Sequence, residues 1–170
     1  MMSLNSLSGM DRDQFVAALD GVFEHSPWVA ERAWAERPFT STTALREALA
    51  RAMWSASQDE QMRLVRAHPE LAGRAAIRGE LTAESTREQA GARLDACSPE
   101  EFARLQTLNA AYSAKFGFPF IMAVRGYDRT QIIERFDARL RNSPADEFRE
   151  ALGQIERIAT LRLTDLVSEA

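Results

Sequence analysis

The side chains best suited to acid–base chemistry gather between residues 67 and 89. His68 is one of only two histidines in the chain and directly precedes Pro69. A residue before proline is pushed out of the helical region, so His68 is expected at a break between two helices, with its imidazole turned away from the helix axis. Histidine ordinarily titrates near ~6.5 and can both take and give a proton at neutral pH. A single histidine before a proline is more often a structural or surface residue, and it is the polar helix face nearby that favours an acid–base role for His68.

A second polar group follows a short distance along the chain. Ser85, Glu88 and Gln89 stand at i, i+3 and i+4 of a helical pattern, so their side chains point from one face. Thr82 is a suitable cap for this helix. The three residues are either the polar lining of a pocket beside His68 or the solvated side of a surface helix.

Other kinds of chemistry find less support in the sequence. His68 and Glu70 form an H-x-E triplet, but the P-C-x-x-C pair that completes this motif in zinc deaminases is missing. Cys97 is the only cysteine, which excludes an internal disulfide and a multi-cysteine metal site. The sequence has neither a nucleophile elbow nor a glycine-rich phosphate loop. We therefore expect an acid–base pocket that holds no metal and needs no cofactor, or a helical binding module without chemistry.

Helix-start signals recur along the chain and indicate how these residues are positioned. Serine or aspartate is followed three residues later by glutamate or glutamine, the pattern of a capping box, or directly by proline. The signals are Asp11 with Gln14, Ser26-Pro27, Ser57 with Glu60, Ser98-Pro99 with Glu101, Asp128 with Gln131, and Ser143-Pro144. They predict an all-α single domain over residues 1–170 with about eight helices, the first running to about His25. Residues 1–10 are expected to be flexible.

One stretch departs from the helical pattern. Residues 118–124 (FPFIMAV) include a proline and no polar side chain, lie between Gly117 and Gly126, and precede Arg125. Such a run is too short for a typical helix and predicts a buried extended segment, which we call the strap. Its backbone N–H and C=O groups have no partner strand in this sequence. They must be satisfied by side chains, water or a ligand.

Composition limits the partners and the compartment. The chain of 170 residues has 21 basic and 25 acidic residues, a net charge of −4, and no basic run, so neither nucleic acid nor an acidic membrane surface is expected as a partner. No apolar run approaches the ~18 residues of a membrane span. The start of the chain lacks the apolar core of a signal peptide, and a single cysteine fits a reducing compartment. We expect a soluble, cytoplasmic protein that acts on a small molecule.

Three motifs together resemble a known family. They are His68-Pro69-Glu70-Leu71-Ala72-Gly73, Ser85-x-x-Glu88-Gln89, and Phe116-Gly117-Phe118-Pro119-Phe120-Ile121 running on to Arg125. In this order they resemble the 2-oxo-4-hydroxy-4-carboxy-5-ureidoimidazoline (OHCU) decarboxylases of urate degradation. Residues 23–28 and 157–163 are also similar to that family, and the likeness extends over roughly residues 15–167.

The resemblance implies an all-helical, cofactor-independent and often dimeric enzyme, a carboxy-lyase that turns OHCU into (S)-allantoin and carbon dioxide. It implies that His68 is the catalytic residue, with Glu88 beside it as the second catalytic candidate. The substrate-binding residues it implies are Pro69, Ser85, Glu88, Gln89, Ile121, Met122, Ala123, Val124 and Arg125. The alternative is a non-catalytic helical module that binds a small ureido-heterocycle.

The sequence departs from the family pattern at one place. After the Glu-Gln pair the family usually continues into an A-G-L-D run, whereas this chain reads Ala92-Arg93-Leu94-Asp95. Arginine is a good helix former, so we expect a straighter helix at Arg93 than glycine would allow.

Overall fold

The computed structural model describes residues 1–169, which form two compact units. The first unit holds residues 1–67 and the chain from Glu156 onward, and the second holds residues 68–155. The first unit contains α1 (Leu4–Ser8), α2 (Arg12–Ala18), α3 (Trp28–Ala33), the 3-10 turn η1 (Trp34–Glu36), α4 (Thr42–Trp54) and α5 (Gln58–Ala67). The second contains α6 (Arg74–Arg78), α7 (Ala83–Gly91), the 3-10 turn η2 (Leu94–Ala96), α8 (Pro99–Phe116) and α9 (Arg129–Arg139).

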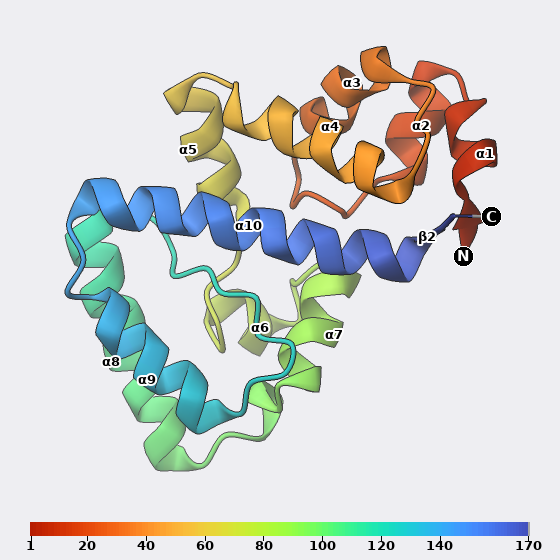
Figure 1. Ribbon diagram of the computed structural model, residues 1–170. Coiled ribbons are helices and arrows are strands. Elements are labelled where there is room, and N and C mark those ends of the chain that lie inside the picture. Colours follow the sequence, from red (N-terminus) through yellow and green to blue (C-terminus); the bar gives the residue numbers. More distant parts are fainter. Residues whose placement is uncertain (170) are drawn as a thin grey trace. The chain divides into compact units, whose positions relative to one another are not determined.

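The last helix, α10 (Pro144–Leu166), begins in the second unit and ends in the first (Figure 1). Besides helices, the described chain has one parallel pair of two-residue strands, β1 (Met2–Ser3) and β2 (Val167–Ser168). The all-α fold predicted from the sequence is confirmed. That the two units form one domain stays a prediction.

Most of the helix-start signals in the sequence are used as expected; the exception is Ser26, whose hydroxyl donates to the Glu24 carbonyl and does not cap α3. Complete capping boxes begin α2 at Asp11, α8 at Ser98 and α9 at Asp128. At α5 the Ser57 N–H donates to the Glu60 carboxylate at 2.9 Å, and the Glu60 N–H donates to the Ser57 hydroxyl at 3.3 Å. Each such cap contributes about 1 kcal/mol. Local side-chain chemistry therefore fixes where most of these helices begin.

The start of the chain contains a short helix that the sequence did not predict. Residues 4–8 form α1, in which Leu4 and Leu7 are buried. With α1 and α6 the described residues contain ten α-helices instead of about eight. Both extra helices have five residues, which is too short for a periodic apolar pattern to be recognised in the sequence.

The first predicted helix is also shorter than expected. We predicted a helix to about His25, but α2 ends at Ala18. Gly21 (φ 83°) and His25 (φ 46°) have left-handed backbones that a helix cannot accommodate. Val22 is nevertheless buried, which explains why the apolar spacing resembled a continuing helix.

A buried ion pair organises the core of the first unit. Arg162 of α10 donates from Nη1 to the Glu24 carboxylate at 2.9 Å and to the Gly21 carbonyl at 2.8 Å. Both side chains of the pair are almost fully buried, with exposures of 5% for Arg162 and 2% for Glu24. The irregular segment after α2 is thereby tied to the last helix.

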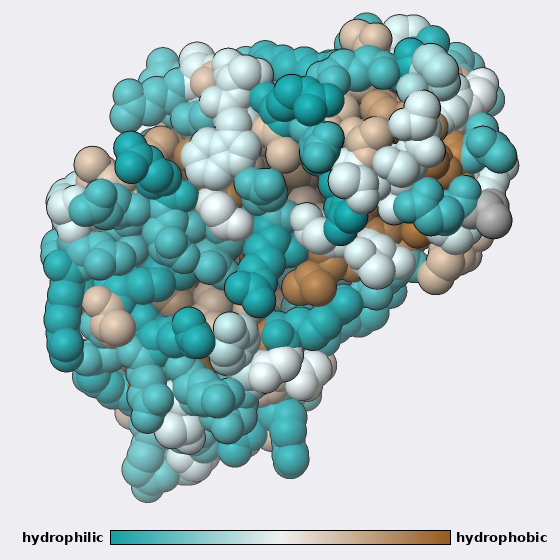
Figure 2. Space-filling model, in the orientation of Figure 1, coloured by the Kyte–Doolittle hydropathy of each residue, from teal (hydrophilic) through white to brown (hydrophobic). Residues whose placement is uncertain are grey.

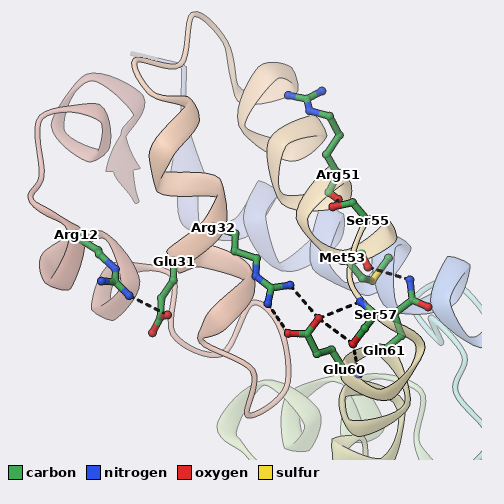
Figure 3. A network of polar contacts seen from close by, with 9 residues as sticks. All are labelled: Arg12, Glu31, Arg32, Arg51, Met53, Ser55, Ser57, Glu60 and Gln61. Carbon is green, nitrogen blue, oxygen red and sulfur yellow. Dashed lines mark hydrogen bonds and ion pairs between the residues drawn. The ribbon is translucent and has the colours of Figure 1, made fainter.

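A more exposed polar network joins the helices of the same unit (Figure 3). Glu60 at the start of α5 pairs with Arg32 of α3 and also accepts from Ser57. The hydrogen bond from Arg32 lowers the pKa of Glu60 to about 2, with a further contribution from the Ser57 N–H. Gln61 donates to the Met53 carbonyl at 3.1 Å, which ties α5 to the end of α4.

Aromatic side chains form the core of the second unit. The Tyr112 ring of α8 lies 5.8 Å from Phe118, 5.6 Å from Phe120 and 5.7 Å from Phe136, measured between ring centroids. Phe120 stacks on Phe136 of α9 at 3.9 Å. The strap is therefore packed against α8 and α9 by its own phenylalanines.

On the face shown in Figure 2, hydrophilic side chains predominate and apolar ones show in scattered groups. No helix in residues 1–169 is both long and apolar enough to cross a bilayer.

The prediction of a straighter helix at Arg93 is wrong. α7 ends at Gly91, and Arg93 has φ 57° and ψ 32°, a left-handed conformation that turns the chain into η2. The Arg93 carbonyl accepts from Arg129 at 3.2 Å. Helix propensity cannot act where the backbone is left-handed, and a glycine there avoids the Cβ clash that arginine accepts.

Arg93→Gly is therefore expected to stabilise the protein. The substitution removes a left-handed Cβ penalty of roughly 1–2 kcal/mol. Glycine also gives the unfolded chain more entropy, which offsets part of this gain, so the free energy of unfolding should rise by about 1 kcal/mol. Urea denaturation measures this difference. Arg93→Ala, which keeps the Cβ, is the matched control, and the interpretation is wrong if the glycine variant is no more stable than the alanine variant.

Candidate active site in the second unit

His68 begins the loop after α5, as its position before Pro69 predicted. α5 ends at Ala67, and residues 68–73 lie outside helix. The His68 side chain is only 7% exposed, so it is not a surface histidine. Pro69 and Glu70 are partly exposed, whereas Leu71 and Ala72 are buried. The His68 imidazole is thus buried, although its backbone is not helical.

The backbone of this loop turns tightly. Ala72 has φ 49°, a left-handed conformation that is costly for a residue other than glycine. A Cβ on Gly73 would lie 2.6 Å from the Cβ of Glu70, closer than real Cβ contacts come. Gly73 therefore allows a close approach that any larger residue would prevent.

Three amide side chains from α7 and α8 hold the loop after His68. Gln89 of α7 accepts from the Ala72 N–H at 3.0 Å and donates to the Glu70 carbonyl at 3.3 Å. Gln106 of α8 donates to the Ala72 carbonyl at 2.9 Å, and Asn109 of α8 donates to the Leu71 carbonyl at 3.0 Å. We call Gln89, Gln106 and Asn109 the amide clamp.

The polar face of α7 points inward. The Thr82 hydroxyl accepts from the Ser85 N–H at 3.2 Å, as the predicted cap requires. Ser85 and Gln89 are buried and Glu88 is partly exposed, whereas Thr86 is exposed. The interpretation of Ser85 and Gln89 as a solvated surface is therefore excluded. Gln89 directly joins this face to the His68 loop.

The strap satisfies part of its backbone through side chains, as expected. Arg139 of α9 donates to the Ile121 carbonyl, and the Ala123 N–H donates to Gln154 of α10 at 2.9 Å. The side chains of residues 121–124 are all buried. Arg125 is exposed and stands where the strap ends in a turn.

Arg139 is itself held by a buried carboxylate. Glu147 of α10 has no exposed side-chain surface and accepts from Arg139 Nε at 2.7 Å. It also accepts from the Tyr112 hydroxyl and, at 2.8 Å, from Asn142. Burial, and then the Glu147 carboxylate, raise the pKa of Tyr112, so its hydroxyl remains a donor. We call Arg139, Glu147, Tyr112 and Asn142 the strap network.

A groove of about 510 Å³ lies beside α7. Its lining includes Thr86, Ala90 and Phe102, and it also reaches Ala72 and Gln89. His68, Ser85 and Glu88 do not line it. The groove therefore borders the amide clamp at Gln89 but does not include the acid–base candidates.

The donor set does not suit a metal. In residues 1–169 no three histidine, cysteine, aspartate or glutamate side chains come together as a metal site would require. Cys97 is partly buried, and its thiol donates to the Leu94 carbonyl at 3.3 Å. Burial raises the pKa of this thiol, which opposes formation of a nucleophilic thiolate.

Sequence reasoning missed the residues that hold the loop and the strap. Asn109 lies in the buried stripe of α8, between Leu105 and Tyr112, and Glu147 lies one helical turn before the buried Ala151. The available signal was a polar side chain at a position where the helical period requires an apolar one. Such a side chain must find a buried partner.

Solved structures first define the class of fold. The chain superposes on the crystal structure of (S)-allantoin synthase with a TM-score of 0.76 and 26% identity, over 98% of this chain and 54% of that chain, about half its length. It superposes on the crystal structure of OHCU decarboxylase in the presence of (S)-allantoin with a TM-score of 0.68 and 22% identity, over 85% and 94% of the two chains. The fold is therefore that of a group of all-helical proteins that includes an OHCU decarboxylase.

Sequence comparison identifies the family itself. The chain belongs to the OHCU decarboxylase family, whose model matches residues 8–164 and so extends through both units. It is 43% identical to the 2-oxo-4-hydroxy-4-carboxy-5-ureidoimidazoline decarboxylase of Halalkalicoccus jeotgali, over 97% of this chain and 92% of that protein. It is 42% identical to the enzyme of the same name from Haloferax volcanii, over 98% and 97%. The family predicted from the three motifs is confirmed.

Loss of the Gln89 amide should loosen the His68 loop. Gln89→Met keeps the length of the side chain but leaves the Ala72 N–H and the Glu70 carbonyl without their partner, at a cost of roughly 1–3 kcal/mol. We expect amide hydrogen exchange at Ala72 to become about tenfold faster, measured by NMR.

The exposed neighbour Thr86 provides the control on the same helix. Thr86→Ala should leave exchange at Ala72 unchanged. Equal exchange rates at Ala72 in Gln89→Met and the wild-type protein would contradict the role of the amide clamp.

Proposed function

We propose that this chain decarboxylates OHCU to (S)-allantoin and carbon dioxide in urate degradation, with His68 as the acid–base group. The observation that carries the proposal is the family match over residues 8–164, together with near-full-length relatives that are named for this reaction. The buried His68, in a loop held by the amide clamp, supplies the acid–base group that the reaction needs.

The substrate supplies its own electron sink. The carboxylate of OHCU stands on a carbon that also bears a hydroxyl and neighbours a ring C=N bond. When the bond to the carboxylate breaks, carbon dioxide leaves, and the electron pair moves to the ring nitrogen, which takes a proton. The hydroxyl then loses its proton to become a carbonyl, and the neighbouring carbon gains one. The enzyme has to orient the carboxylate and direct these protons, and this requires no cofactor.

His68 is the proposed proton carrier. Its imidazole accepts the hydroxyl proton and delivers a proton to one face of the neighbouring carbon, so that one stereoisomer forms. Proton transfer by a positioned side chain typically contributes ~10²–10⁴-fold to the rate. The tight turn at Ala72 and Gly73 and the amide clamp keep the loop from carrying the imidazole away.

The face of α7 is proposed to bind the polar edges of the substrate. Glu88 accepts from ring or ureido N–H groups, and its charge favours loss of the substrate carboxylate as neutral carbon dioxide. Ser85 and Gln89 orient the ureido and carbonyl groups, and Pro69 borders the same site. An amide has two N–H groups and two acceptor lone pairs, so Gln89 can hold the loop and still offer one of each to substrate.

The strap is proposed as the opposite wall. Backbone groups of residues 121–124 position the substrate, and Arg125 pairs with an anionic group of the substrate. An arginine that bound the carboxylate too strongly would stabilise the ground state and oppose its loss. The backbone donors of the strap therefore contribute more to orientation than Arg125 does.

The comparisons favour the enzyme over a non-catalytic module that binds a ureido-heterocycle, because the relatives are named as decarboxylases over nearly their whole length. We extend the proposal to a cytoplasmic homodimer, from the resemblance to a family that is often dimeric. Sedimentation equilibrium tests the dimer, which requires twice the chain mass of 19.1 kDa.

The proposed reaction predicts a stereochemical signal. OHCU is generated from urate with urate oxidase and hydroxyisourate hydrolase, and the circular dichroism of the allantoin formed is followed. Spontaneous decay gives racemic allantoin and no net signal, whereas this protein should give a rapid signal of (S)-allantoin.

His68→Asn is expected to remove most of this turnover, by ~10²-fold or more, because asparagine cannot carry the proton. The variant should keep the helical far-ultraviolet spectrum of the wild-type protein. Turnover close to wild type in a folded His68→Asn protein would refute the role of His68. No signal from the folded wild-type protein would refute the decarboxylase.

A further inference from the structure

Two side chains hold the strap from one edge. In an extended chain, residues i and i+2 direct their backbone groups to the same side, and the residue between them directs its groups to the other side. The Ile121 carbonyl and the Ala123 N–H are two positions apart and are bound by Arg139 and Gln154. These two side chains therefore occupy the same edge of the strap.

The other edge of the strap is only partly satisfied, since the Val124 carbonyl accepts from the Tyr127 N–H at 3.0 Å. Met122 and Val124 are buried, but within residues 1–169 the Met122 backbone and the Val124 N–H make no hydrogen bond. Buried backbone groups are costly when unsatisfied. The Met122 and Val124 N–H groups and the Met122 carbonyl therefore remain as two donors and one acceptor. Their positions are fixed by Arg139 and Gln154, which bind the first edge.

Arg139 has further contacts besides its hydrogen bond to the Ile121 carbonyl. Glu147 binds its Nε, and the guanidinium carbon stands 4.4 Å from the centroid of the Phe120 ring. Glu147 is in turn fixed by Tyr112 and Asn142. Gln154 is fixed as well, because its Nε2 donates to Glu150 at 2.9 Å. A buried ion pair often adds little net stability. The Arg139–Glu147 pair is therefore better explained by the fixed orientation that it gives to Arg139.

We propose that Arg139, oriented by Glu147, and Gln154 are positioning residues for the decarboxylation. By binding the Ile121 carbonyl and the Ala123 N–H, they set the rotation of the strap and so direct the other edge, at Met122 and Val124, toward the substrate. The inference rests on the proposed function of this chain. Neither residue touches the substrate; each acts through the strap backbone.

Two variants test this proposal, and one is expected to disturb the strap more than the other. Glu147→Gln keeps the shape of the side chain but removes the charge that holds Arg139, and Gln154→Leu removes the partner of the Ala123 N–H. Misplacement of a reacting group by 1 Å costs on the order of 10²-fold. We expect kcat to fall about 10²-fold in Glu147→Gln and roughly tenfold in Gln154→Leu, with a lower enantiomeric excess of allantoin in both.

The matched control is Glu24→Gln, which removes the other buried glutamate that pairs with an arginine, in the first unit. It should lower the melting temperature as Glu147→Gln does, but leave kcat and the enantiomeric excess unchanged per folded molecule. All assays use enzyme concentrations at which turnover is much faster than spontaneous decay. If Glu147→Gln does not fold, the milder Gln154→Leu decides.

Amide hydrogen exchange at Ala123 separates the two proposals. It should accelerate in Gln154→Leu whether or not the protein turns over OHCU. If wild-type protein is active and both folded variants keep its kcat, KM and enantiomeric excess, the positioning role is wrong. If Ala123 exchange is unchanged in Gln154→Leu, the hold on the strap is wrong. An inactive wild-type protein overturns the proposed function instead, and exchange at Ala123 still tests the hold.

Discussion

Two buried segments without regular structure impose the central constraint on the second unit. The loop of residues 68–73 and the strap of residues 118–124 have no sheet ladder to satisfy their N–H and C=O groups, and each unsatisfied group in the interior would cost about 1–3 kcal/mol. The backbone groups of the surrounding helices cannot serve as partners, since they are already hydrogen-bonded within each helix. Long polar side chains from α7 to α10 supply many of the partners, and these helices have to lie within reach of the two segments.

α8 connects the two segments. Gln106 and Asn109 face the loop, and Tyr112, one turn further on, faces the aromatic side chains of the strap and donates to Glu147. A single rigid helix thus sets the spacing between the part of the chain that carries the acid–base histidine and the part that carries the proposed binding edge. Precision of this kind is easier to achieve on a helix than on loops alone, because the side chains of a helix have fixed rise and rotation.

How much of this could be predicted depended on whether the signal was local. Caps at Asp11, Ser98 and Asp128, and the break at His68, act over three or four residues and were found correctly. Arg139 and the Ile121 carbonyl that it binds lie 18 residues apart in the sequence. No local pattern in either segment indicates that the two are partners. The conformation at Arg93 was missed for a different reason: helix propensity describes a residue inside a helix, and Arg93 lies just beyond one, in a left-handed turn.

The pairing of β1 with β2 has a topological consequence. Met2 is in register with Val167, so the two ends of the described chain lie side by side in the first unit. A chain whose ends meet is almost a closed ring, and the same contacts could be made by a sequence that starts elsewhere, with a short linker joining the present ends and a new opening in an exposed turn. For this unit, the packing contacts then depend little on the order in which its segments follow one another. Evolution or design is free to permute the segments while keeping the buried Glu24–Arg162 pair intact.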